Sequence, residues 1–301
     1  MRVAVLGPGG VGGLLGALLA RAGKEVVVVA KEQTAELISA EGIKVRSVMF
    51  GEFTAHPKAV SELTEPQDLL IVATKAVTLV EGLERIKAEV GLVVPLLNGL
   101  DHIALLRGRF GPRRVAAATI RVESDRPQPG VVVHTSPFIY VELASSDPEV
   151  RQRLEQVAAL LGEVGVPARV KESEAEVMWS KLVRLNALAC LTSAYDLPLG
   201  RIRNTPELYD ELKAVIAEGA AVAQAEGAPI EAEEALQELE LAHDSLGSSM
   251  QRDIAAGREP ELDAIPGAVL RAAERHNLRC PTIERLVGQI AKRAAGRERE
   301  G

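Results

Sequence analysis

The stretch that decides the fold is "RVAVLGPGGVGGLLGALLARAG", residues 2–23. It begins with a short β-branched run, continues through closely spaced glycines, and ends in an apolar stretch rich in Leu and Ala. This order predicts a buried strand over 2–7, a tight turn, and a helix over 11–23.

The glycines of this stretch have the spacing G-x-G-x-x-G between the predicted strand and helix. In such a unit one glycine makes the turn, the next lets the backbone approach a pyrophosphate, and the third packs the helix on the strand. The helix N-terminus then faces the anion. A glycine-rich turn without a ligand is the alternative reading. We predict that the following residues bind a dinucleotide: Gly7, Gly9, Gly10, Val11 and Gly12.

Outward from this stretch, short apolar runs alternate with helical patterns. Continuous Val/Ile/Leu runs are typical of strands buried on both faces of a parallel sheet, and their alternation with helices predicts βαβ units. The expected strands are 25–30, 68–74 and 91–99, with a helix over 32–42. Three further runs follow closely, and we expect them to form a more antiparallel end of the same sheet: 115–120, 130–135 and 138–143.

The pattern changes after about residue 145. Asp147 and Pro148 have the residue types of an N-cap and a first helical position, and they open a predicted helix. From Ser173 onward only helices are expected, over 173–195, 205–226, 231–243, 248–256, 262–277 and 282–295. The sequence thus predicts an α/β protein with a Rossmann-like dinucleotide-binding domain, residues 1–170, and an all-α domain, residues 171–301. A cleft between them is the expected place for a small ligand.

Composition excludes several classes of function. The chain of 301 residues is 47% hydrophobic and carries a net charge of −7 without a long basic run, which argues against a nucleic-acid partner. No apolar run reaches about 18 residues, so no membrane span is expected. The N-terminus lacks a signal-peptide layout, and we expect a cytoplasmic protein. The two cysteines and five histidines show no ligand spacing, so no metal site is expected.

The end of the second expected strand discriminates between cofactors. NAD-binding proteins usually have an acidic residue there for the ribose hydroxyls. This chain has Lys31, whose charge suits the 2′-phosphate of NADP, although Glu32 follows and could serve NAD instead. Lys75 and Asn98 follow two later strands, at the edge where ligands bind in such sheets. A solvated lysine and a simple Asn-Gly turn are the alternatives for these two.

A lysine inside a predicted helix raises a separate question. The helix "EVMWSKLVRLNALACLTSAY", residues 176–195, carries Lys181 near its start. Helical spacing alone does not distinguish a surface lysine that extends its charge into water from one that donates a proton.

The C-terminal segment contains "SSMQRDI" and then "EPELDAIPG", residues 248–267. Together with "VLGPGGVG", "ATKA", "LNG" and "MWSKL" in that order, these motifs make nearly the whole chain resemble ketopantoate reductase, the 2-dehydropantoate 2-reductase family. The resemblance implies NADPH-dependent reduction of ketopantoate to pantoate, in pantothenate and coenzyme A biosynthesis. It also implies a helical domain similar to that of 6-phosphogluconate dehydrogenase.

The resemblance assigns roles to matching residues. Lys181 is implied as the general acid, and Asn98 as the residue that positions the substrate carbonyl. Ser249 is implied to bind the substrate carboxylate. Glu261 is implied to bind the terminal hydroxyl or the lysine network, and Asp253 to orient substrate or structure. In the cofactor site the resemblance puts Lys31 at the 2′-phosphate and Lys75 near the nicotinamide.

The chain departs from the family at three polar positions. Where the family commonly carries asparagines, an ungapped count gives Leu185, Ala189 and Leu199. Asn186 is one residue late, about 100° around the helix. These differences concern the part of the pocket that distinguishes substrates more than the hydride step.

Two alternative functions remain open. A related reductase would act on another branched 2-oxo acid. A dinucleotide-binding sensor would bind NADPH without turnover, but the presence of both Lys181 and Glu261 argues against it. The sequence also leaves a homodimer open.

Overall fold

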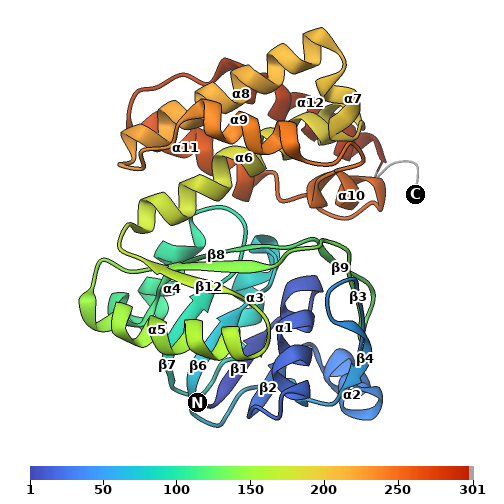
Figure 1. The fold of residues 1–301 in the computed structure, drawn as a ribbon, viewed down its shortest axis with the longest axis vertical. Coiled ribbons are helices and arrows are strands. Elements are labelled where there is room, and N and C mark those ends of the chain that lie inside the picture. Colours follow the sequence, from blue (N-terminus) through green and yellow to red (C-terminus); the bar gives the residue numbers. More distant parts are fainter. Residues whose placement is uncertain (298–301) are drawn as a thin grey trace. The chain divides into compact units, whose positions relative to one another are not determined.

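The computed structural model describes residues 1–297 and divides into two compact units. The first comprises Met1–Leu97 and His102–Val177, and the second comprises Asn98–Asp101 and the chain from Met178 onward. Figure 1 gives the elements of both by label. The short segment at Asn98 therefore leaves the first unit and belongs with the helices.

The core of the first unit is a five-stranded sheet in the order β5-β2-β1-β6-β7. All its pairings are parallel, which confirms the predicted Rossmann-like sheet. In chain order the strands are β1 (Val3–Leu6), β2 (Val26–Val29), β5 (Lys58–Val60), β6 (Gln67–Val72) and β7 (Val90–Pro95).

Both faces of this sheet are covered, as the continuous apolar runs predict. Val3 and Val5 belong to one apolar cluster, together with leucines of α1 and α5. Ala4 and Leu6 belong to a second cluster, which takes in apolar residues of α3 and α4. The helices of this unit are α1 (Gly10–Arg21), α2 (Glu32–Glu41), α3 (Leu79–Leu83), α4 (His102–Phe110) and α5 (Pro148–Glu163), with short turns η1 (Ala76–Thr78) and η2 (Pro112–Arg114).

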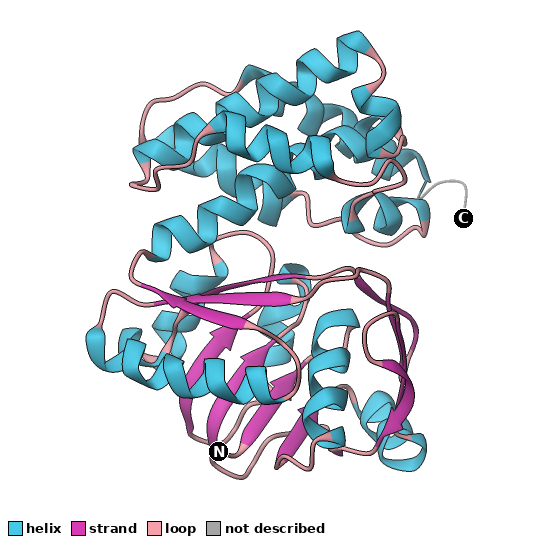
Figure 2. Cartoon of the chain, in the orientation of Figure 1, coloured by secondary structure: helices cyan, strands magenta, loops and turns pink. Residues whose placement is uncertain are grey.

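The prediction for the three later runs is confirmed in part. Each run has an antiparallel partner, but apart from an isolated bridge between Val115 and Val93 the runs do not join the parallel sheet. They are distributed over two further sheets, visible as separate groups of arrows in Figure 2. One has the order β4-β3-β10-β9, and the other β12-β11-β8. Their strands are β3 (Ile43–Ser47), β4 (Gly51–Ala55), β8 (Ala117–Arg121), β9 (Ser124–Gln128), β10 (Val131–His134), β11 (Tyr140–Ala144) and β12 (Ala168–Lys171).

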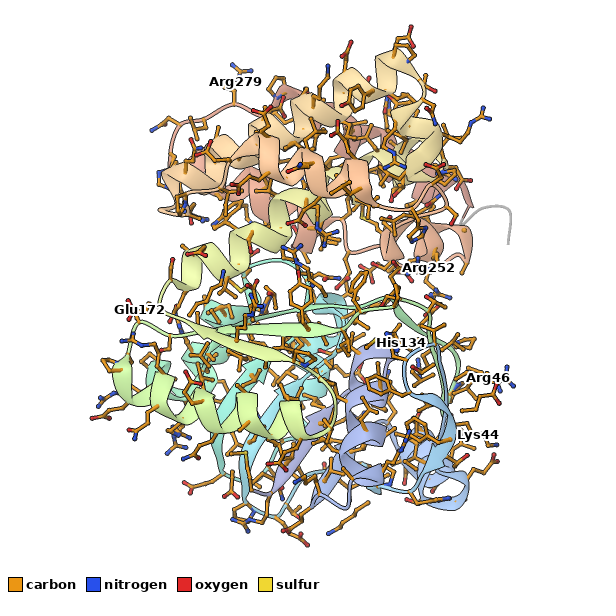
Figure 3. The ribbon with its side chains drawn as sticks, in the orientation of Figure 1. Lys44, Arg46, His134, Glu172, Arg252 and Arg279 are labelled. Atoms are coloured by element: carbon orange, nitrogen blue, oxygen red, sulfur yellow. The ribbon has the colours of Figure 1, made fainter. Side chains whose placement is uncertain are left out.

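The separate sheet around β10 was not predicted because one of the partners of β10 comes from elsewhere in the chain. β10 pairs in parallel with β3, some ninety residues earlier, and β3 is half-buried rather than continuously apolar. Its charged residues Lys44 and Arg46 are exposed and point outward from the sheet, while Val45 between them is buried (Figure 3). Such a short alternating strand is hard to recognise before its partner is known.

The start of α5 confirms a local prediction. Asp147 is the N-cap, and its side chain accepts hydrogen bonds from the backbone N–H groups of Glu149 and Val150. Pro148 opens the helix. A carboxylate and a proline here satisfy or remove N–H groups that would otherwise lack a helical partner.

Helices are the only regular elements among the described residues of the second unit, as predicted. Its helices are α6 (Glu174–Tyr195), which begins in the first unit, α7 (Leu199–Arg203), α8 (Pro206–Ala225), α9 (Ala232–Leu241), α10 (Ser249–Ala255), η3 (Asp263–Gly267), α11 (Ala268–Arg275) and α12 (Pro281–Arg297). The single helix expected over 262–277 is instead η3, a π-turn that contains Pro266, followed by α11. Proline lacks the N–H that a regular helix needs, which accounts for the irregular turn.

Candidate functional site

The first candidate site is the turn between β1 and α1. Helix α1 begins at Gly10, after an N-cap glycine that supplies no side-chain hydrogen bond. Its first turn carries no acidic residue. The first turn itself adds no negative charge at the positive end of the helix dipole, which suits a bound anion.

The glycines of this turn have distinct roles. A Cβ on Gly12 would lie closer than 3.0 Å to the carbonyl oxygen of Gly7, so the helix packs directly on the turn. Gly7 has φ of +89°, a conformation that favours glycine. A Cβ on Gly9 would meet only the carbonyl oxygen of Ala73, at 3.9 Å. The turn is thus tight where it meets its own backbone and open at Gly9, which fits the approach of a pyrophosphate.

Two lysines follow the strands on either side of β1. Lys31 comes after β2, directly before α2, and Lys75 comes after β6, directly before η1. Because β2, β1 and β6 are parallel neighbours, their carboxyl ends share one edge of the sheet. The structure thus brings the glycine turn, Lys31 and Lys75 to that edge, where open α/β sheets bind ligands.

Lys31 already has an acidic partner. Its Nζ lies 3.0 Å from Oε1 of Glu81, on α3, and Glu81 also lies 3.6 Å from Arg85. The hydrogen bond and charge of Lys31 hold the pKa of Glu81 below its usual range. Nothing in the sequence around Glu81 indicated this contact. A 2′-phosphate at Lys31 would compete with a carboxylate for the same ammonium group.

The second candidate site lies in the helical unit and consists of three side chains. Lys181 Nζ donates to Oδ1 of Asn98 at 2.9 Å, and Asn98 Nδ2 donates to Oε2 of Glu261 at 2.9 Å. The ammonium can only donate and an ionised carboxylate can only accept, so these two partners fix the orientation of the amide. Glu261 is 4% exposed. We call these residues the Lys181 triad.

The segment that carries Asn98 is fastened to this unit by its neighbours. Gly99 has φ of +85°, and a Cβ there would lie closer than 3.0 Å to the carbonyl oxygen of Ala264, in η3. Arg271 pairs with both Asp101 and Asp263. The Asn-Gly pair is therefore more than a turn signal, because its glycine allows the close approach that holds Asn98 beside Glu261.

Helix α10 carries the two remaining predicted residues. The N-cap is Ser248, whose Oγ accepts from the backbone N–H of Gln251 at 3.0 Å, while Ser249 is the first helical residue and is partly exposed. Asp253 is 3% exposed and accepts from Nε of Arg258 at 2.9 Å. Ser248 is thus occupied in the cap, and Asp253 takes part in an ion pair.

The positions that depart from the family pattern are largely buried. Ala189 and Leu199 are 0% exposed, and Leu185 is partly exposed. Asn186 is also 0% exposed, and its Oδ1 accepts from Sγ of Cys190 at 3.5 Å. Asn186 therefore lies in the interior of the helical unit and does not take the place of the missing asparagines.

Comparison with known proteins identifies the protein family to which the chain belongs. The model described as "Ketopantoate reductase PanE/ApbA" matches residues 3–144, and its "C terminal" counterpart matches residues 175–294. The chain belongs to the ketopantoate reductase family. It is accordingly an oxidoreductase, and its redox partner is a nicotinamide dinucleotide.

The individual relatives described next share 22–27% sequence identity with this chain. "Uncharacterized oxidoreductase YkpB" of Bacillus subtilis is 27% identical over 96% of this chain and 98% of its own. The structure of 2-dehydropantoate 2-reductase from Geobacter metallireducens has a TM-score of 0.90 at 27% identity, covering 97% of this chain and 99% of that one. D-mandelate dehydrogenase with NADH and anilino(oxo)acetate has a TM-score of 0.90 at 22% identity, covering 98% and 99%, and shows the same fold.

Residues 1–297 contain neither a helix suited to a membrane nor a cluster suited to a metal ion. None of the helices there combines the length and apolarity that crossing a bilayer requires. No group of three or more His, Cys, Asp or Glu side chains in that range is arranged to hold a metal ion.

Proposed function

We propose that this protein reduces 2-dehydropantoate to (R)-pantoate with NADPH, in the cytoplasmic biosynthesis of pantothenate and coenzyme A. The observation that carries the proposal is the Lys181 triad, in a chain of the ketopantoate reductase family. The triad combines a proton donor, an amide that fixes its position, and a nearly buried carboxylate.

The glycine turn and Lys31 form the cofactor site in this proposal. The N-terminus of α1 and the open face at Gly9 support pyrophosphate binding, and Lys31 supports a 2′-phosphate. A bound NADPH supplies the hydride. Lys75, at the same sheet edge, is proposed to contact the nicotinamide end. The Lys31–Glu81 pair favours NADPH less strongly than an unpaired lysine would, because the phosphate must compete with Glu81.

The proton step belongs to Lys181. When hydride reaches the C2 carbonyl carbon of a 2-oxo acid, negative charge develops on the carbonyl oxygen. The Lys181 ammonium would donate a hydrogen bond and then a proton to that oxygen. Asn98 holds Nζ through Oδ1 and is itself held by Glu261, so the donor has a defined position.

The rest of the substrate site is proposed on α10 and beside the triad. Ser249 is proposed to bind the substrate carboxylate, and its partly exposed place at the start of α10 supports this role. Glu261 is proposed to accept from the terminal hydroxyl of ketopantoate as well as from Asn98. Asp253 is proposed to orient this region through its pair with Arg258.

A second candidate substrate is another branched 2-oxo acid. The observation that favours it is that Leu185, Ala189 and Leu199 have apolar side chains, where the family commonly has asparagines. A substrate without a terminal hydroxyl would need fewer polar partners, and replacing buried hydrogen-bonding groups changes selectivity by large factors.

The test is the rate of NADPH oxidation with ketopantoate and with 2-oxoisovalerate, and with NADH as the control cofactor. Fast oxidation with ketopantoate alone would support the proposal. Equal or faster oxidation with 2-oxoisovalerate would move the substrate to the second candidate. Binding of NADPH without oxidation in the presence of either acid would contradict both and indicate a sensor.

A further inference from the structure

Strand β9 lies against the first turn of α1. Ser124, its first residue, donates from Oγ to the carbonyl oxygen of Gly10 at 2.8 Å. A Cβ on Gly10 would lie closer than 3.0 Å to the carbonyl oxygen of Ser124 and to Cα of Asp125. The missing side chain at Gly10 therefore lets the β9 backbone contact the start of the proposed dinucleotide helix.

The backbone before Ser124 is held by a buried hydroxyl. The N–H of Glu123 donates to Oγ of Ser136 at 2.9 Å, and Ser136 Oγ donates to the carbonyl oxygen of Phe138 at 2.6 Å. Nε2 of His134 lies 3.1 Å from the same Oγ. The single hydroxyl proton is used toward Phe138, so Ser136 can only accept from His134, and Nε2 must carry a proton.

The other ring nitrogen has the opposite role. Nδ1 of His134 lies 2.8 Å from Oγ of Ser47, which accepts the backbone N–H groups of Met49 and Phe50 at 3.1 and 2.9 Å. Ser47 therefore directs its own proton to Nδ1. His134 is 1% exposed and stacks on Phe50, with ring centroids 5.8 Å apart. The contacts together specify one state, the neutral imidazole with its proton on Nε2.

We propose that His134 and Ser136 are positioning residues for dinucleotide binding, because they hold the Glu123–Ser124 backbone that is fastened to the first turn of α1. The inference rests on the proposed dinucleotide site at the glycine turn. It adds residues outside the glycine motif, at the end of β10 and just after it, more than a hundred positions further along the chain (His134 is labelled in Figure 3). Movement of this backbone would shift the N–H groups at the start of α1 that face the pyrophosphate.

The network also gives the site a dependence on pH. A second proton on His134 would turn Nδ1 into a donor that faces the donating hydroxyl of Ser47. Of the described groups around the ring, Glu123 is the charged one and favours protonation, as does the Phe138 carbonyl, while Ser47, Ser136 and Phe50 carry no charge.

The sign of the dependence follows from the buried, neutral state. Burial is the largest influence and lowers the pKa of His134 below its usual value near 6.5. The contribution of the neutral ring to stability is therefore complete above about pH 6.5. It is lost as the pH falls through the lower pKa of the folded protein.

The experiment measures dissociation constants of NADP⁺ and NAD⁺ at about pH 8 and about pH 5.5. NAD⁺ is included because the 2′-phosphate of NADP⁺ titrates near pH 6 by itself. At the higher pH, Ser136→Ala is expected to weaken both nucleotides about tenfold, since two buried N–H groups lose their acceptor. Ser124→Ala, which removes one hydroxyl from a partly buried position, is expected to weaken both about threefold.

His134→Gln separates positioning from titration. Glutamine offers an N–H donor and an oxygen acceptor but does not titrate, so this variant should bind NAD⁺ at about pH 8 within about threefold of the unaltered protein. It should also lose most of the weakening that the unaltered protein shows as the pH falls through the lowered pKa of His134. The matched control is His56→Gln, since His56 is an exposed histidine of the same unit and should keep the unaltered pH profile.

The outcomes are distinguishable. If the unaltered protein binds neither nucleotide, the dinucleotide site and this inference both fail. If it binds while Ser136→Ala and Ser124→Ala bind equally well, or while His134→Gln keeps the full pH dependence, the inference alone is overturned. Should one of Ser136→Ala and His134→Gln fail to fold, the other still decides the matter, and Ser124→Ala tests the contact with α1 separately.

Discussion

The two units build their candidate sites from different parts of the chain. In the first unit the site is mainly backbone: a helix N-terminus and four glycines within six residues. In the second unit the site consists of side chains, those of Asn98, Lys181 and Glu261. Lys181 and Glu261 follow Asn98 by 83 and 163 residues along the sequence. A backbone site tolerates little change in local shape, whereas a side-chain site depends on contacts between distant segments.

The largest effect is expected at the proton donor. Lys181→Ala should lower kcat by about 10²- to 10⁴-fold, because it removes the proposed general acid and the charge that stabilises the carbonyl oxygen. The measurement is steady-state turnover with NADPH and the best oxo acid. Lys213→Ala is the control, since Lys213 is an exposed lysine of α8 in the same unit. Turnover of Lys181→Ala equal to that of the control would show that Lys181 has no catalytic role.

The second-largest loss of turnover is expected when the amide of the Lys181 triad is removed. Asn98→Ala should lower kcat by about 10- to 100-fold, because Lys181 and Glu261 lose the group that joins them. Cofactor affinity should change little. An equal loss in the dissociation constant of NADPH would place Asn98 in the cofactor site instead.

A glycine pair tests how Asn98 is held. Gly99→Ala and Gly23→Ala both add a side chain at positive φ, but only Gly99 has a backbone oxygen in the way, that of Ala264. Gly99→Ala should therefore lower kcat by about tenfold and reduce thermal stability, while Gly23→Ala should show only the modest strain of its conformation. Equal effects on kcat would mean that the close approach to Ala264 does not position the triad.

The preference for NADPH over NADH tests the proposed cofactor site in the first unit. Lys31→Glu should weaken NADPH by about tenfold or more and NADH much less, because only NADPH carries the 2′-phosphate. Glu81→Gln should act in the opposite direction, strengthening NADPH about twofold to threefold, since Lys31 loses its competing partner. Equal responses of NADPH and NADH to Lys31→Glu would refute the phosphate assignment.

The smallest effect concerns the cap of α5. Asp147→Ala should lower the melting temperature by about 2 °C at neutral pH, because two backbone N–H groups lose their acceptor. Arg113 holds the pKa of Asp147 below its usual range, so the ionised carboxylate's contribution persists in mildly acidic buffer and is lost only as the pH falls through that lowered pKa. A melting temperature unchanged at neutral pH would mean that water replaces the cap.

The same contrast explains what the sequence predicts well. The glycine turn and the Asp147 cap depend on neighbours within a few residues, and each is found where the sequence predicts it. The strands of the parallel sheet pair with distant segments, but each is marked by its own continuous apolar run. The pairing of β10 with β3 and the contact of Lys31 with Glu81 depend on distant segments, and no local sequence pattern predicts them. The three residues of the triad were named only through the family resemblance, because the spacing around Lys181 fits a surface lysine equally well, and the contacts that join them come from the structure.

The most direct test of whether cofactor binding and proton donation lie in separate sites is a titration of NADPH into the Lys181→Ala variant. Cofactor binding is proposed for the backbone of the glycine turn, and proton donation for the Lys181 triad. The expected dissociation constant is within about threefold of that of the unaltered protein, although turnover is lost. A dissociation constant raised in proportion to the loss of turnover would contradict the account, since Lys181 would then bind the cofactor rather than donate the proton.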